Sequence, residues 1–195
     1  MLKVVVLISG GGSNLKALLD AAAANDYPAT IVAVGSDTDA PGLDYATQAG
    51  VPSFVVRPRD HENREAWGEA LAAAIRAYEP GLVVSAGLMR VLPAGFVREF
   101  SPRLINTHPA LLPLFPGAHA VRDALAAGAA ETGVTVHIID EGVDTGPTLR
   151  QRSVAILADE NEAELHERIK QLERPLLVDT VRDIANGTLD LTTPR

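Results

Sequence analysis

The chain has 195 residues, 47% of them hydrophobic, no cysteine, and a formal net charge of −8 at pH 7. Its length suits one domain with a sizeable core, because compact domains cluster near ~100–200 residues. The lack of cysteine excludes a thiol nucleophile, a disulfide framework and cysteine-based zinc sites. The acidic balance argues against a nucleic-acid partner, and no apolar run reaches the ~18 residues of a membrane span. We therefore expect a single domain over residues 1–195, located in the cytoplasm.

Apolar, β-branched runs alternate along the chain with alanine-rich helical stretches. Strands are predicted at residues 3–9, 29–36, 52–58, 81–87, 103–108, 133–140 and 146–156. Helices are predicted at residues 14–24, 41–50, 61–80, 93–100, 119–128 and 159–187. Only a short loop separates the last two strands, so they should pair antiparallel. This order predicts an α/β fold, a doubly wound, mostly parallel seven-stranded sheet with helices on both faces and an antiparallel edge.

The limits of the last predicted helix rest on particular residues. Asp159 and Glu162 have the spacing of a capping box at its start, and Gly187 suits its end. Pro175 lies inside it and has no amide hydrogen to donate. We expect this proline to kink or divide the helix.

Ligands of doubly wound sheets bind beyond the carboxyl ends of the strands, at a switch point in the strand order. In this chain the rule selects the loops at residues 9–14, 88–92 and 106–117. The loop at residues 140–145 also follows a predicted strand. We expect the functional residues to lie in these loops.

The first of these loops reads SGGGSNLK and joins the first strand to the first helix. Its glycines let a ligand approach the backbone, and Ser13 and Asn14 occupy the helix start, where free N–H groups and the helix dipole favour an anion. The loop lacks the GK[ST] ending of a P-loop and the third glycine of a dinucleotide fingerprint, although Asp37 could mimic the ribose-binding acid. A cradle for a phosphomonoester is favoured, and a ligand-free turn capped by Ser13 or Asn14 stays open.

The segment RLINTHPALLPLFPG places an amide and an imidazole two residues apart at a strand end. Residues two apart on a strand point to the same face, so Asn106 and His108 should project together. An amide donor and an imidazolium suit a carbonyl oxygen that acquires negative charge, and the ring can protonate a leaving group. The prolines that follow should hold this pair stiffly. Of the acids at residues 140–145, Asp144 is best placed to keep the histidine protonated.

Other interpretations of these residues are open. Asn-Thr-His at a strand end can simply satisfy backbone groups, and His119 can simply begin a helix. His137 is either a satisfied core histidine or a partner of the site. A metal site built from His108, His119 and Asp144 lacks the usual ligand spacing. A Ser-His-Asp hydrolase using Ser13 lacks the nucleophile elbow.

Four segments, LISGGGSNL, AGLMRVLP, LINTHPALLPLFPG and TGVTVHIIDEGVDTGP, together resemble the phosphoribosylglycinamide (GAR) formyltransferase family of the formyltransferase superfamily. The match runs in register from the first strand to the last helix. The Asn-x-His-Pro-x-Leu-Leu-Pro segment with a downstream Asp-x-Gly-Pro is specific to the superfamily. The Gly-Ser-Asn loop and the expected lack of further domains narrow the resemblance to the GAR enzymes. A Rossmann-like formyltransferase fold is implied.

The resemblance assigns site residues to three groups. Catalysis would fall to Asn106, His108 and Asp144. The substrate GAR would be bound by Gly12, Ser13, Asn14, Lys170 and Glu173. The cosubstrate 10-formyltetrahydrofolate would be bound, largely through backbone groups, by Arg64, Met89, Arg90, Val91, Leu92, Asn106, Asp140, Glu141, Gly142, Val143 and Asp144. No metal is implied. Residues 1–100 would chiefly bind the phosphate and ribonucleotide, and residues 101–195 would carry catalysis and folate binding.

The implied reaction transfers the formyl group of 10-formyltetrahydrofolate to the amine of GAR in de novo purine synthesis. A tetrahedral intermediate would be stabilised by Asn106 and His108. The chain departs from the family's pattern at Ala110, Leu114, Arg174 and Pro175, which bears on the ribonucleotide site. A formyltetrahydrofolate hydrolase and a non-catalytic nucleotide-binding module stay open as alternatives. The expected partners are the two small molecules, and the chain is expected to be a monomer or homodimer.

Overall fold

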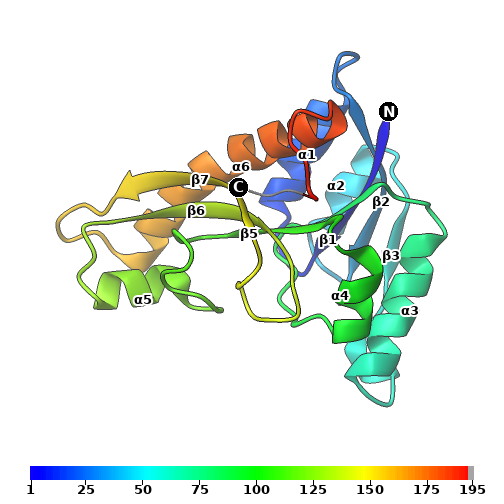
Figure 1. The fold of residues 1–195 in the computed structure, drawn as a ribbon, viewed down its shortest axis with the longest axis horizontal. Helices are drawn as coiled ribbons and strands as arrows, with labels where there is room; N and C mark the ends of the chain where they lie inside the picture. Colours follow the sequence, from blue (N-terminus) through cyan, green and yellow to red (C-terminus); the bar gives the residue numbers. More distant parts are fainter. Residues whose placement is uncertain (193–195) are drawn as a thin grey trace.

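A computed structural model of the protein describes residues 1–192, so the last three residues of the expected domain, 193–195, lie outside the described residues. The strands are β1 (Leu2–Ile8), β2 (Ala29–Ser36), β3 (Ser53–Val55), β4 (Leu82–Ser85), β5 (Leu104–His108), β6 (Glu131–Ile138) and β7 (Thr148–Ala155). They form one sheet in the order β3-β2-β1-β4-β5-β6-β7 (Figure 1). The first five are parallel, whereas β6 runs antiparallel to both of its neighbours. The predicted fold class is confirmed.

The helices cover both faces of this sheet. They are α1 (Ser13–Ala22), α2 (Leu43–Gln48), α3 (Arg64–Arg76), α4 (Ala94–Phe100), α5 (Ala120–Ala126) and α6 (Glu162–Ala185), with a 3₁₀ turn at Pro58–Asp60. Alternate residues of β1 face opposite layers, as a strand buried on both sides requires. Val4, Val6 and Ile8 pack with α1 and α6, while Val5 and Leu7 pack with α3 and α4.

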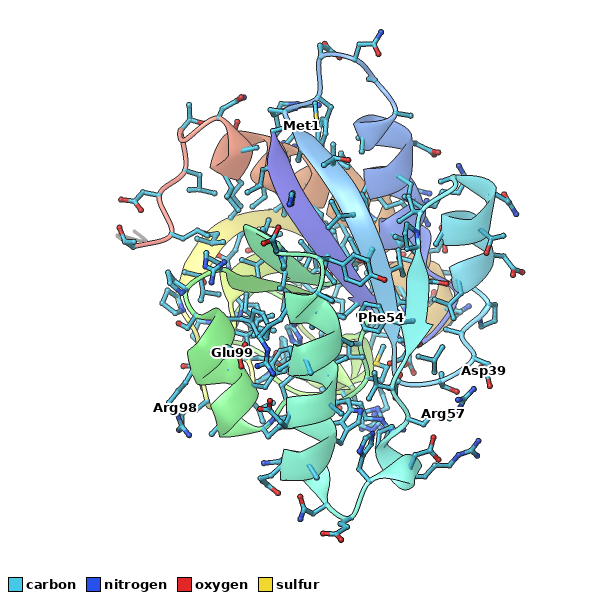
Figure 2. The ribbon with its side chains drawn as sticks, turned by 90° about the vertical axis from the view of Figure 1, so that its right-hand side faces the viewer. Met1, Asp39, Phe54, Arg57, Arg98 and Glu99 are labelled. Atoms are coloured by element: carbon cyan, nitrogen blue, oxygen red, sulfur yellow. The ribbon has the colours of Figure 1, made fainter. Side chains whose placement is uncertain are left out.

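The layer formed by α3 and α4 has ion pairs at its outer surface. Figure 2 shows these two helices side by side on one face of the sheet. The guanidinium of Arg76 on α3 donates to the carboxylate of Glu99 on α4 at 2.9 Å. Nearby, Arg57 pairs with Asp39 at 2.5 Å, and both side chains are labelled in the same view. The first contact joins α3 to α4, and the second joins the loops after β2 and β3.

Strand β5 continues the same alternation up to its tip, and this sets the geometry of the site. Leu104 packs in the layer of α3 and α4, and Ile105 packs in the layer of α1 and α6. By the period of a strand, Asn106 and His108 share the face of Leu104, and Thr107 shares the face of Ile105. The tip of β5 therefore presents different side chains to the two layers.

The long helix α6 differs from its prediction in two ways. Its capping box is formed by Asn161 and Glu164, whose side chains bond to each other's backbone N–H groups, and not by Asp159 and Glu162. Asp159 instead has a left-handed backbone (φ 59°) in the turn before the helix. The helix also continues through Pro175, so the proline does not divide it, and the kink expected as the other outcome stays a prediction. Within residues 1–192, no helix is long and apolar enough to cross a membrane.

Candidate active site

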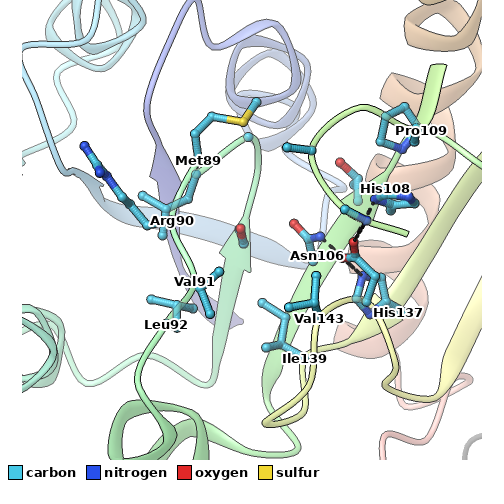
Figure 3. A pocket seen from close by; sticks show the side chains of 18 of the residues that line it. Met89, Arg90, Val91, Leu92, Asn106, His108, Pro109, His137, Ile139 and Val143 are labelled. Atoms are coloured by element: carbon cyan, nitrogen blue, oxygen red, sulfur yellow. Dashed lines mark hydrogen bonds and ion pairs between the residues drawn. The ribbon is translucent and has the colours of Figure 1, made fainter. Parts of the chain in front are cut away.

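A cavity of about 350 Å³ opens beyond the carboxyl ends of β4 and β5. Four segments line it: the loop after β4, the tip of β5, the start of α5 and the loop after β6. Figure 3 shows Met89, Arg90, Val91 and Leu92 along one side, with Asn106, His108, His137 and Val143 on the other. The start of α6 also contributes, through Glu162 and His166. The cavity adjoins the switch point between β1 and β4, where the fold predicts a ligand.

His108 is held on both sides of its ring. Its Nδ1 atom lies 3.3 Å from Oδ2 of Asp144, and its Nε2 atom lies 2.8 Å from the carbonyl oxygen of Phe115. Carboxylate and carbonyl oxygens only accept hydrogen bonds, so a ring that carries a proton on each nitrogen satisfies both partners. With side chains 5% and 13% exposed, His108 and Asp144 are largely removed from water. The geometry therefore favours a charged imidazolium.

Asp144 is fixed by three neighbours. The backbone N–H of Gly117 donates to Oδ2 at 2.8 Å, and Nε2 of His137 lies 3.6 Å from Oδ1. The pKa of Asp144 lies below its ordinary value, chiefly because of hydrogen bonding from His137, with further help from the Gly117 N–H and the charge of His108, while burial opposes the shift. Its backbone is left-handed (φ 55°), a conformation that aspartate tolerates better than most residues.

His137 belongs to this cluster, and the sequence left its role open. It lies directly opposite Asn106 in the β5–β6 register, and its Nε2 atom is 3.2 Å from the amide nitrogen of Asn106. Its Nδ1 atom lies 3.0 Å from the carbonyl oxygen of Ile138. A proton on Nδ1 satisfies the Ile138 carbonyl, which only accepts hydrogen bonds. Nε2 lies near both the Asn106 amide nitrogen and Oδ1 of Asp144, so His137 connects the amide to the carboxylate.

The loop at residues 140–145 reaches the site by a route that the sequence did not indicate. Because β6 is antiparallel to β5, its last residue, Ile138, pairs with Ile105 rather than with His108. The loop must turn back to bring Asp144 beside His108. Oδ1 of Asp140 accepts from Thr145 Oγ1 at 2.7 Å and shapes this turn. At Gly146 a Cβ atom would lie 1.8 Å from the Ile138 carbonyl oxygen, so only glycine permits the closure.

The proline-rich loop after β5 is anchored by hydrogen bonds as well as by its prolines. The buried hydroxyl of Thr135 on β6 donates to the Ala110 carbonyl at 2.7 Å and accepts from the Leu112 N–H at 3.0 Å. The Gln151 amide on β7 donates to the Leu112 carbonyl at 2.8 Å. The predicted stiffness of this loop thus comes partly from strands that follow it in sequence.

The loop after β4 is tied to the ends of β1 and β2. The hydroxyl of Ser9 accepts from the Met89 N–H at 2.8 Å and donates to Asp37 at 2.6 Å. The Arg90 guanidinium donates to the other oxygen of Asp37 at 2.6 Å, and Figure 3 shows this side chain directed away from Asn106. The buried Asp37 carboxylate is therefore engaged within the protein, which does not suit the ribose-binding role considered for it.

The glycine loop leaves the start of α1 without a side-chain cap. The N-cap residue is Gly12, with a left-handed backbone (φ 68°), and no side chain accepts from the first turn. Neither Ser13 nor Asn14 takes the capping role that a ligand-free turn would give it. The amide of Asn14 instead donates to the hydroxyl of Thr107 on β5 at 3.4 Å. The N–H groups of the first turn remain free for an anion.

The remaining residues assigned by resemblance lie at the margins of the cavity or across β5 from it. Arg64, at the start of α3, is 54% exposed and lines a groove that shares Met89, Arg90 and Val91 with the cavity. The Glu141 carboxylate pairs with Arg98 on α4 at 3.0 Å. On α6, Lys170 lies 3.6 Å from Glu167, and Glu173 accepts from Thr107 at 2.5 Å. Within residues 1–192, His, Asp and Glu side chains form no group of three arranged to hold a metal.

The fold and this cluster define an α/β formyltransferase. Residues 2–181 match the family model described as formyl transferase. A phosphoribosylglycinamide formyltransferase of Mycobacterium tuberculosis (strain ATCC 25618 / H37Rv) is 54% identical over 183 residues, which cover 94% of this chain and 85% of that protein. The enzyme of that name from Escherichia coli (strain K12) is 38% identical over 191 residues, covering 97% of this chain and 90% of that protein.

Solved structures agree with these relatives. Glycinamide ribonucleotide transformylase 1 from Symbiobacterium toebii superposes with a TM-score of 0.93 at 39% identity, over 96% of this chain and 89% of that chain. The chain therefore belongs to the phosphoribosylglycinamide formyltransferase family, whose formyl transfer serves purine biosynthesis, and it is a formyltransferase. Membership of this family implies a folate-type cosubstrate.

Proposed function

We propose that the protein transfers the formyl group of 10-formyltetrahydrofolate to the amine of GAR in de novo purine synthesis, in the cytoplasm. The observation that carries this proposal is the His108–Asp144 pair, lying beside Asn106 at the rim of one cavity. We further propose that residues 1–195 act as a single domain. Residues 1–100 supply the phosphate loop, and residues 101–195 supply the catalytic tip of β5. The division is not strict. Arg64 and Met89–Leu92 of the first part are proposed to bind folate, and Lys170 and Glu173 of the second part are proposed to bind GAR.

The acceptor GAR is proposed to bind on the face of β5 that carries Thr107. The uncapped first turn of α1, with Gly12, Ser13 and Asn14, suits a phosphate dianion because its N–H groups and dipole favour negative charge. Lys170 adds a cation from α6, and Glu173 adds an acceptor for the hydroxyl or amine groups of the ribonucleotide. These residues come from two helices that pack closely, α1 and α6.

The folate is proposed to occupy the cavity on the opposite face of β5. Met89–Leu92, Asp140 and residues 142–144 line it. Their backbone groups, with those of Glu141 beside them, would bind the pterin ring, and Arg64 would reach the charged tail of the cosubstrate. The exposed apolar side chains of Met89, Val91 and Val143 border the opening. Apolar walls with a few fixed polar groups are typical of pockets for flat aromatic ligands.

The chemistry follows from bringing the two substrates together at the tip of β5. The amine of GAR attacks the formyl carbon, and a new C–N bond forms as the carbonyl oxygen becomes negative. The amide of Asn106 donates to this oxygen, and the charge of His108 stabilises it. The C–N10 bond then breaks, the oxygen re-forms a carbonyl, and N10 takes up the proton that the amine loses. For His108 to deliver that proton, its Nε2–H must leave the Phe115 carbonyl oxygen and form a hydrogen bond to N10 instead.

The proposal is tested by incubating the protein with 10-formyltetrahydrofolate in the presence and absence of GAR. A folate absorbance change that requires GAR, with formylated GAR as product, is the expected result. A change of equal rate without GAR would identify a hydrolase instead. No change under either condition would leave only a binding module and would overturn the proposal. Inorganic phosphate should compete with GAR, because both need the α1 N-terminus, and it should not compete with the folate.

A further inference from the structure

Three buried polar side chains form a chain on one face of the sheet, from α1 past β5 to α6. They are Asn14 at the start of α1, Thr107 between the two catalytic positions of β5, and Glu173 on α6, and each is 7% exposed. The Asn14 amide lies 3.4 Å from the Thr107 hydroxyl, which lies 2.5 Å from the Glu173 carboxylate. Thr107 is thus the link between two residues proposed to bind GAR, and it was absent from the residues assigned by resemblance.

The direction of the hydrogen bonds follows from what each group can donate. A hydroxyl has one proton, and at 2.5 Å Thr107 gives it to the carboxylate of Glu173. Thr107 can then only accept from Asn14, so Asn14 must turn its N–H₂ group toward β5. The Oδ1 atom of Asn14 is left buried without a partner in the described part of the chain. Thr107 thereby sets the orientation of both neighbouring side chains.

The position of Thr107 in the strand gives this link a further consequence. Asn106 and His108 flank it in sequence and line the cavity, while the Thr107 hydroxyl bonds to Asn14 on α1 and to Glu173 on α6. A shift of the acceptor-binding groups relative to β5 would displace the amine from the formyl carbon. Because reaction rates are sensitive to displacements of about 1 Å, a short bond at this place holds the two half-sites in register.

We propose that Thr107 is a positioning residue for the acceptor: its hydroxyl fixes Asn14 and Glu173 and aligns them with Asn106 and His108. This inference rests on the proposed function, since it takes Asn14 and Glu173 as GAR-binding groups. The hydroxyl does not touch the reacting atoms. It acts through the orientation of its two partners.

The test compares Thr107→Val with Thr107→Ser and with Thr132→Val. Valine keeps the β-branched shape and removes the hydroxyl, whereas serine keeps the hydroxyl. Thr132 is a matched control, because it is also buried in the sheet and its hydroxyl has no partner among the described residues. Calorimetric titration with GAR alone measures binding, and steady-state assays measure KM for each substrate. Melting temperatures check folding, and Thr107→Ala serves as a second hydroxyl-free variant.

We expect Thr107→Val to weaken GAR binding about tenfold, because hydrogen bonds to charged groups are worth about that ratio or more. The KM for 10-formyltetrahydrofolate should stay within about twofold, and Thr107→Ser and Thr132→Val should bind GAR like the wild type. In a protein that already carries Glu173→Gln, Thr107→Val should weaken GAR binding by a smaller factor than it does in the wild type, because the effects of coupled residues are not additive.

Unchanged GAR binding in Thr107→Val would overturn the inference, as would equal losses for both substrates or a full additive loss in the double variant. These outcomes are separable from failure of the proposed function. If the wild-type protein bound GAR but formed no product, the transferase proposal would fail, while the ratio of GAR dissociation constants would still decide the role of Thr107.

Discussion

The loop after β1 and the tip of β5 lie at the same edge of the sheet but are built in opposite ways. At the tip of β5, both ring nitrogens of His108 and both oxygens of Asp144 already have protein partners. At the loop after β1, the helix begins at Gly12 without a side-chain cap. One region is assembled before any ligand arrives, and the other keeps its donors free.

This difference suits the two regions to different roles. Groups that stabilise charge in a transition state must be oriented in advance, because reorganising them would add to the barrier. Groups that bind a phosphate need only be available, since the ligand itself completes their hydrogen bonds. Changes at the tip of β5 should therefore lower kcat, and changes in the loop after β1 should raise the KM for the acceptor.

The largest effect is expected from removing the donors proposed to act in catalysis. His108→Ala and Asn106→Ala should each lower kcat by about 10²–10³, as loss of one oxyanion donor typically does, with KM values little changed. Initial rates of formyl transfer measure this, and circular dichroism melting confirms that each variant folds. Near-wild-type turnover in a folded His108→Ala protein would contradict the proposal that the tip of β5 carries the groups that set kcat.

Asp144→Asn should have the next largest effect. Losing the charge opposite His108 should lower kcat by about tenfold to a hundredfold, the ratio that one hydrogen bond to a charged group represents. Initial rates of formyl transfer measure this effect. An unchanged kcat in a folded Asp144→Asn protein would contradict the role given to Asp144.

The same variant has a stability signature that serves as its control. Since the pKa of Asp144 in the folded protein lies below its ordinary value of 3.8, its stabilising effect is present above that pH. It is lost as the pH falls through the lower folded-state pKa. Urea unfolding of the wild type should therefore weaken more steeply in acid than unfolding of Asp144→Asn. Identical acid dependence would show that the carboxylate gains nothing from its partners.

Gly12→Ala tests the other region. Alanine at φ 68° with its Cβ 3.0 Å from the Cα of Gly42 should cost about 1–2 kcal/mol of unfolding free energy and raise the KM for GAR several-fold, with kcat retained. Gly50→Ala is a matched control, because Gly50 has the same φ but nothing within 4 Å. It should lose similar stability and leave the KM for GAR unchanged. If both variants altered this KM equally, the loop would have no special role.

The smallest effect is expected at the loop after β4. A change there should alter only the KM for the cosubstrate, which separates this loop from the two regions compared above. Asp37→Asn weakens the contacts that hold Met89 and Arg90, so the KM for 10-formyltetrahydrofolate should rise about threefold to tenfold. Asp39→Asn, whose carboxylate is 75% exposed beside Arg57, should change nothing measurable. An effect of equal size at both positions would point to general electrostatics.

The parts of the site that depend on strand period were predictable. Asn106 and His108 lie two apart on β5, and the period of a strand is enough to put them on one face. The glycine loop was likewise placed by the rule for carboxyl ends of parallel strands. Asp144 was chosen correctly as the neighbour of His108, although the rule for parallel strands does not apply to β6, which is antiparallel.

The contacts that depend on register between distant strands were not predictable from one sequence. His137 meets Asn106 only because β6 pairs with β5 in one particular register. Thr107 meets Glu173 across 66 positions of sequence, and Ser9 meets Met89 across 80. Such pairs leave no local pattern, because side-chain periodicity describes one element at a time.

Neighbouring side chains at the tip of β5 face opposite layers, and this limits where a residue can be inserted in the strand. One extra residue ahead of Asn106 would rotate every later side chain of the strand to the opposite layer. The imidazole would then turn toward the layer of α1 and α6, and the threonine side chain toward the layer of α3 and α4. The number of residues that precede Asn106 in this strand therefore decides which layer each side chain at its tip faces.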